Sequence, residues 1–235
     1  MPGEPIVAAS DESFLIRLGE TVTPETNRRV QAVTEQLLLQ APGWLRNCHP
    51  GYVNLLVEFD CLAIDAGEVR RYLLKLLEAT TSATPLPAAR RLEIAVLYDA
   101  EFGPDLAHVA AHHGLTTDEV IRRHTAPDYH VHFLGFCPGF AYLGGLDSGL
   151  ATPRLASPRI RIPAGSVGIG GEQTGVYPVA SPGGWRLIGR TPVRIFDPTI
   201  EPAVLLAIGD IIRFRSITRV EFNAWPPAAD RGTGG

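Results

Sequence analysis

The chain contains almost no lysine, since Lys75 is the only one, and its positive charge is therefore carried by arginine. The pattern GxxxxGK[ST] is absent, which excludes a P-loop that holds phosphate with a lysine. If the protein handles phosphate or carboxylate groups, arginine side chains and backbone N–H groups must hold them.

Cysteine and long apolar runs are also scarce. Cys48, Cys61 and Cys137 are an odd number without close spacing, which indicates free thiols in a reducing compartment. No run approaches the roughly eighteen apolar residues of a membrane span, and residues 1–20 lack the pattern of a secretory signal. The net charge of −4 provides no basic face for nucleic acid. The sequence predicts a cytoplasmic protein that binds neither nucleic acid nor membrane.

Two short glycine patterns do not carry their usual meaning. The stretch "GIGGEQTG" lacks the spacing of the dinucleotide fingerprint. The stretch "AGSVG" matches the GxSxG elbow of serine hydrolases only as letters, because no helical pattern follows it. Neither a dinucleotide site nor a serine hydrolase is therefore predicted.

The first part of the chain has the pattern of a small α/β domain over residues 1–88. Residues 13–18 alternate apolar and polar side chains as a strand does, and Thr23-Pro24 opens a helix that runs to about Leu39. The remaining elements are expected as strands at 44–48 and 52–60 and a helix at 66–79. Residues 80–89, "TTSATPLPAA", are predicted to be a linker.

The pattern of predicted elements changes after this linker. A strand is expected at 91–99, followed by short helices over 103–115 and 116–125, the first starting near Pro104 and ending at Gly114. From Tyr129 onward, short strands are separated by glycine and proline, as in a barrel or sandwich, and the last strands are expected at 193–197, 203–210 and 211–217. The prediction is an α+β protein with a barrel domain at 89–225 and a disordered tail at 226–235.

Two Gly/Pro-rich segments are candidates for a binding site. In "HFLGFCPGFAYLGGLD", residues 132–147, the rings either line a pocket or fill a barrel corner. In "PAGSVGIGGEQTGVYP", residues 163–178, successive glycine and serine N–H groups are compatible with an anion-binding nest. Arg159 and Arg161 stand two residues apart upstream, so on a regular strand they share one face, either as a converging pair or as solvated side chains.

Histidine and cysteine provide weaker candidates. His130 and His132 supply half of a metal site without a third ligand, so no metal site is predicted. His124 is a candidate catalytic base just before the barrel. Cys137 has no identifiable paired base, and a small buried apolar role is favoured over that of a nucleophile.

The motifs as a set resemble the family of the 5-oxoprolinase B subunit, also known as allophanate hydrolase subunit 1 and including the kinase inhibitor KipI. The resemblance covers residues 10–222 and rests on GFxPGFxYLGGL followed by RxxxPAGSVGIxGxQTGxYPxxSPGGWxxIGRT. It implies an N-terminal α/β domain followed by a cyclophilin-like β-barrel. It also implies action on 5-oxoproline with ATP and Mg²⁺, in a complex with a biotin-dependent carboxyltransferase-like C subunit and an A subunit that completes ring opening to L-glutamate.

The resemblance also suggests site residues by motif position. The motif positions place Arg159, Gln173 and Thr174 in the predicted catalytic group, and His124 joins them as the candidate base named above. Arg159 is expected to pair with an anionic substrate group, and Gln173 and Thr174 to orient an amide or phosphate oxygen. The predicted substrate-binding residues are Phe136, Pro138, Gly139, Phe140, Tyr142, Gly165, Ser166, Tyr177, Ser181, Gly183, Gly184 and Trp185.

Three functions remain open from the sequence. The first is one component of an ATP-dependent 5-oxoprolinase that is inactive without its partner. The second is a KipI-type regulator that binds a histidine kinase and performs no catalysis. The third is a carboxyltransferase-type component of urea or allophanate metabolism. The dense Gly/Pro/aromatic motifs favour a small-molecule site over a flat protein-binding face, and hence the enzyme.

Overall fold

The computed structural model describes residues 4–81, 83–86 and 88–226. The chain divides into two compact units, Met1–Ala88 and Ala89–Gly235. The predicted α+β class is confirmed, since both units combine helices with sheets that are antiparallel apart from the parallel pair of β5 (Arg91–Val96) and β13 (Ile211–Ser216). Of the tail predicted to be disordered, residues 227–235 lie outside the described residues. No described helix is both long and apolar enough to cross a bilayer.

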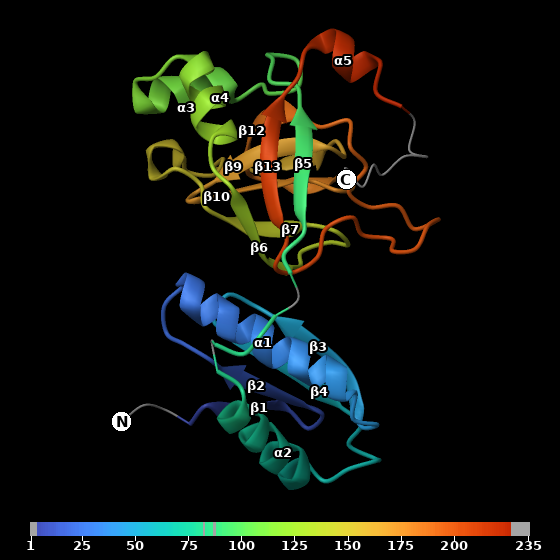
Figure 1. Ribbon diagram of the computed structural model, residues 1–235. Helices are drawn as coiled ribbons and strands as arrows, with labels where there is room; N and C mark the ends of the chain where they lie inside the picture. Colours follow the sequence, from blue (N-terminus) through green and yellow to red (C-terminus); the bar gives the residue numbers. More distant parts are fainter. Residues whose placement is uncertain (1–3, 82, 87, 227–235) are drawn as a thin grey trace. The chain divides into compact units, whose positions relative to one another are not determined.

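The first unit is a four-stranded antiparallel sheet, in the order β1-β2-β4-β3, with two helices on one face (Figure 1). Its elements are β1 (Ile6–Ser10), β2 (Ser13–Arg17), α1 (Pro24–Gln40), β3 (Leu45–Pro50), β4 (Asn54–Phe59) and α2 (Ala66–Ala79). Helix α1 starts as its sequence predicts, because the Thr23 hydroxyl accepts a hydrogen bond from the Thr26 N–H at 3.1 Å. Apolar side chains from both helices and the sheet, including Val30, Leu37 and Leu55, form a separate core.

Strand β1 is absent from the sequence-based prediction. Only Ile6 of its five residues is buried, and the other four are exposed, so it carries no alternating apolar pattern. The strand forms because β2 offers a free edge, and Ile6 pairs with Ile16 of that strand. Strand β1 therefore forms because it pairs with a neighbouring strand, and the local sequence gives no sign of that pairing.

The second unit contains a seven-stranded sheet in the order β12-β9-β10-β7-β6-β13-β5 (Figure 1). Its elements are β5 (Arg91–Val96), α3 (Leu106–His113), α4 (Thr117–Thr125), β6 (Tyr129–Leu134), β7 (Ala141–Gly144), η1 (Ser148–Leu150), β8 (Arg159–Ile162), β9 (Ser166–Gly170), β10 (Gln173–Val176), β11 (Ser181–Gly183), β12 (Arg186–Arg190), β13 (Ile211–Ser216) and α5 (Arg219–Asn223). Strands β8 and β11 form a separate two-stranded ribbon.

The seven-stranded sheet curls until its two edges meet. Leu97, directly after β5, exchanges backbone hydrogen bonds with Arg190 at the end of β12, at 2.8 and 2.9 Å. This bridge nearly closes the sheet into a barrel and satisfies edge groups that would otherwise stay unpaired. The apolar core of the unit lies inside, with Val131, Val167 and Phe214 among its buried members.

Two late strand predictions are wrong. Residues 193–197 and 203–210 form no strand, and only an isolated bridge joins Phe196 to Val204. The segment carries Pro192, Pro198 and Pro202, which lack the backbone N–H that a sheet ladder requires. It therefore runs as an irregular loop between β12 and β13.

A last helix, α5, follows the barrel although no helical period is visible after Tyr129. The Thr218 hydroxyl accepts from the Glu221 N–H while the Glu221 carboxylate accepts from the Thr218 N–H. This reciprocal cap is the T-x-x-E pattern, so the local signal was present in the sequence.

Candidate functional site

Three aromatic residues from three separate segments meet in the second unit, and we call Phe140, Tyr177 and Trp185 the aromatic cluster. The Phe140 ring centroid lies 5.5 Å from that of Tyr177 and 5.4 Å from that of Trp185. All three rings are buried, together with Ile162 and Leu187. The Gly/Pro-rich motifs therefore do converge, but these rings mainly pack against one another, which agrees with the barrel-corner interpretation as well as with a pocket floor.

The rim of this cluster comes from the turn between β6 and β7. Phe136 is 61% exposed, has a left-handed φ of 64°, and its ring lies 5.5 Å from that of Phe140. Pro138 is exposed, whereas Gly139 is buried. Tyr142 stacks on Phe133 with a centroid distance of 4.3 Å. Phe136 is therefore the ring of this segment that is most available for contact.

Close packing around Tyr177 explains one glycine of the motif. A Cβ atom on Gly183 would lie only 2.4 Å from the Tyr177 hydroxyl oxygen and 2.7 Å from Cδ1 of Ile162. The neighbouring predicted residues Ser181 and Gly184 are partly buried, and the Ser181 Oγ has no hydrogen-bond partner among the described residues. The β11 segment thus packs directly over the aromatic cluster.

Arg159, the arginine predicted to bind an anion, lies beside this cluster and is paired with Asp105. Two guanidinium nitrogens of Arg159 contact the two carboxylate oxygens of Asp105 at 3.0 and 2.9 Å. Arg159 also donates to the Trp185 carbonyl at 3.4 Å, and its side chain remains 30% exposed. The guanidinium is therefore fixed in direction and still reaches solvent.

Asp105, which stands directly before α3, is not among the residues that the sequence predicted for the site. An aspartate at this position usually caps the helix, but Asp105 makes no such hydrogen bond. Its carboxylate instead accepts from the Leu187 N–H at 2.7 Å, and Arg186 lies 3.9 Å away. No local pattern indicates this contact, because Asp105 and Arg159 are 54 residues apart.

Of the two arrangements open for Arg159 and Arg161, a converging pair or solvated side chains, the converging pair is not observed. The register of β8 against β11 shifts between the pairs Gly183–Arg159 and Ser181–Ile162, so two residues of β8 stand opposite one of β11. Ile160 and Arg161 are both exposed while Ile162 is buried. This bulge turns Arg161 away from the side on which Arg159 lies.

The anion nest with which residues 163–178 are compatible is not formed in β9. Residues 166–170 form β9, which is hydrogen-bonded to β10 on one side and β12 on the other. Gly165, with a φ of 81°, donates its N–H to the Tyr177 carbonyl, and Ser166 is buried. Backbone N–H groups used in a sheet are not available to a ligand.

His124 and Thr174 form a buried network in the barrel. The His124 ring bonds the Tyr98 hydroxyl through Nδ1 and the Thr174 hydroxyl through Nε2, both at 2.8 Å. Burial lowers the pKa of His124 to about 3, so its imidazole is neutral at physiological pH. His124 and Thr174 are both fully buried, whereas Gln173, directly before Thr174, is partly exposed. In this conformation His124 can position β10 but does not reach a substrate.

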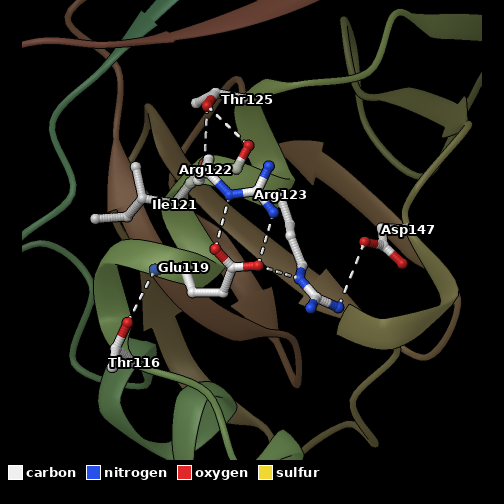
Figure 2. Close-up of polar contacts among 7 residues, drawn as sticks. All are labelled: Thr116, Glu119, Ile121, Arg122, Arg123, Thr125 and Asp147. Atoms are coloured by element: carbon white, nitrogen blue, oxygen red, sulfur yellow. Dashed lines mark hydrogen bonds and ion pairs between the residues drawn. The ribbon is translucent and has the colours of Figure 1, made fainter.

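A second arginine-rich region, around the end of α4, is less suited to anions. A hollow of about 310 Å³ is lined by Arg122, Arg123, Ala126, Pro127, Gly145 and Asp147. Glu119 accepts hydrogen bonds from both arginines (Figure 2). The N–O distance is 2.7 Å in each of the two ion pairs. These hydrogen bonds lower the pKa of Glu119 to about 2 and compensate much of the positive charge.

The two histidines of β6 differ in their exposure to solvent. His130 is exposed and His132 is partly buried, at a register shift in the strand. Within the described part of the chain, no group of three or more His, Cys, Asp or Glu side chains is arranged to hold a metal ion.

Comparison with known proteins places these motifs in a family. Residues 5–206 match the family model "Carboxyltransferase domain, subdomain C and D". The chain is 40% identical over 230 residues to the Bacillus subtilis protein named as the B subunit of 5-oxoprolinase, covering 92% of this chain and 93% of the relative.

Two solved structures extend the comparison. TTHA0988 superposes with a TM-score of 0.78 at 40% identity, over 88% of this chain but only 40% of its own. Kluyveromyces lactis urea carboxylase shares the fold alone, with a TM-score of 0.75 at 19% identity over 95% of this chain and 24% of its own. The chain therefore belongs to the family of carboxyltransferase subdomains C and D and resembles a 5-oxoprolinase B subunit over most of that relative's length.

Proposed function

We propose that this chain is the B subunit of an ATP-dependent 5-oxoprolinase, which converts 5-oxoproline to L-glutamate together with a C subunit and an A subunit. The observation that carries the proposal is the 40% identity to a 5-oxoprolinase B subunit over nearly the whole length of both chains. The name of that relative also supports a role within a multi-subunit enzyme.

The chemistry of the site is compatible with this reaction. Phosphoryl transfer from ATP to the lactam oxygen would release ADP and activate the ring carbonyl carbon toward water. After water adds, the C–N bond breaks with its electron pair going to the protonated nitrogen, and the phosphoryl group leaves as inorganic phosphate. Such transfer depends mainly on positioning and on charge stabilisation. Arg159 supplies a guanidinium of fixed direction, and Mg²⁺ would be carried on the nucleotide phosphates, as is usual for this ion.

The predicted residues take different places in the proposal. Arg159, Phe136 and Gln173 have exposed surface and are proposed to contact the substrate or nucleotide. His124 and Thr174 are proposed to act indirectly, by holding β10 in place through their buried hydrogen bond. The aromatic cluster is proposed to form the floor below the substrate.

The test is ADP release by this chain alone, by its partner subunits alone and by the mixture, each with and without 5-oxoproline. We expect ADP release that requires the mixture and rises with 5-oxoproline, with L-glutamate formed in step. A stable complex of all three proteins that releases no ADP in response to 5-oxoproline would refute the proposal.

A further inference from the structure

Arg154 lies in the segment before β8, and its guanidinium carbon stands 5.8 Å from the Trp185 ring centroid, over the ring. The side chain is exposed, and no described residue forms a hydrogen bond or ion pair with it. A cation over an aromatic face is held in direction without using its N–H donors. Those donors therefore stay available to an incoming group.

Arg154 and Arg159 both contact the same residue, Trp185. Arg159 donates to the backbone carbonyl of the residue whose ring Arg154 covers. Burial raises the pKa of Tyr177 to about 12, and the positive charges of Arg154 and Arg159 both oppose that rise. Both guanidinium groups are thus within electrostatic reach of one hydroxyl in the aromatic cluster.

The local charge is positive. Arg159 and Arg186 share the single carboxylate of Asp105, with Arg186 at the longer distance of 3.9 Å. Arg154 adds a further positive charge with no acidic partner among the described residues. This differs from the hollow at α4, where Glu119 and Asp147 stand against two arginines.

We propose that Arg154 and Arg159 together bind an anionic group, a carboxylate or a phosphate, beside Trp185. Asp105 orients Arg159, and the Trp185 ring orients Arg154, so the two side chains act as a preformed pair. The identity of the ligand rests on the proposed function, which offers two sources: the carboxylate of 5-oxoproline and the phosphates of ATP.

The first experiment measures binding to the isolated full chain by calorimetry at low ionic strength, with 5-oxoproline and with tripolyphosphate as probes. We expect saturable binding of at least one probe and a loss of about tenfold in affinity for Arg154→Ala, as for a charge-assisted hydrogen bond. Arg161→Ala is the matched control, because it removes an equal charge from a side chain that the bulge turns outward. Its affinity should change less than about twofold.

Because Arg154 is exposed, its replacement should leave the fold intact, and circular dichroism of the variant checks this. Absence of binding to the wild-type chain, or equal affinities of the wild type and Arg154→Ala, would overturn the inference.

The second experiment uses the assembled enzyme and identifies the source of the anion. A rise of about tenfold in the Michaelis constant for the lactam substrate in Arg154→Ala, with kcat nearly unchanged, would assign the carboxylate. The same rise in the Michaelis constant for ATP would assign the phosphates. If neither constant moves, the inference is wrong even though the enzyme is active. If the wild-type complex has no activity, the proposed function fails, while calorimetry still tests the anion site.

Discussion

Replacing Asp105 tests whether the contact with Arg159 holds this part of the barrel together. Asp105 is 7% exposed, and its carboxylate joins the start of α3 to β8 and to the Leu187 N–H of β12. Asp105→Ala leaves the buried Leu187 N–H without an acceptor, at a cost of about 1–3 kcal/mol. It also removes the partner of Arg159, but that side chain is 30% exposed and can be hydrated.

We therefore expect Asp105→Ala to lower the free energy of unfolding by about 2–4 kcal/mol. Breaking a fully buried ion pair costs about 3–5 kcal/mol, and the expected loss is somewhat smaller because Arg159 is partly exposed. Asp105→Asn retains an oxygen for the Leu187 N–H and should cost less, about 1–2 kcal/mol. Urea unfolding followed by fluorescence in a Trp44→Phe background, in which the remaining tryptophans lie in the second unit, measures both values.

Asp210 offers a matched control of the same design. Its carboxylate binds the Arg90 Nε at 2.9 Å and accepts from the Ala207 N–H at 2.7 Å. Asp210→Asn should reduce stability by a similar amount but leave anion binding unchanged. Asp105→Asn should reduce both the stability and the affinity for anions, because Arg159 loses the carboxylate that orients it. A loss below about 0.5 kcal/mol for Asp105→Ala, or equal effects of the two Asn variants on binding, would refute the reasoning.

Three further predictions concern the buried hydrogen bonds of His124, the packing of β11 over the aromatic cluster, and the exposed turn at Phe136. Burial lowers the pKa of His124 from 6.5 to about 3. On acidification, the His124 imidazole is therefore protonated at a higher pH in the unfolded chain than in the folded chain. The free energy of unfolding should fall by about 1.5 kcal/mol between pH 6.5 and 5, and urea titrations of His124→Gln should lack this component. Gly183→Ala should cost about 1–3 kcal/mol through its clash with the Tyr177 hydroxyl, and Tyr177→Phe should restore part of that loss if the clash is the cause. Phe136→Gly should be about 1 kcal/mol more stable than Phe136→Ala in thermal unfolding, because φ at this position is 64°; equal stabilities would contradict the strain.

The elements with local signals could be predicted from the amino-acid sequence alone. Thr23-Pro24 and the apolar period place α1, Gly114 ends α3 in the left-handed conformation that its type permits, and Thr116 caps α4. These signals act within one or two turns of the chain, so neighbouring residues suffice to specify them. The order of the motifs was also sufficient to indicate the family.

Which side chains meet depends on the folded arrangement of distant segments. The bulge in β8 separates Arg159 from Arg161, although their spacing in the sequence suggests a shared face. Asp105 pairs with Arg159 across 54 residues, and Arg154 reaches Trp185 from another segment. His124 is buried only because α4 packs against the barrel sheet. Each of these contacts depends on strand register and on packing between distant segments, which no local pattern of residues encodes.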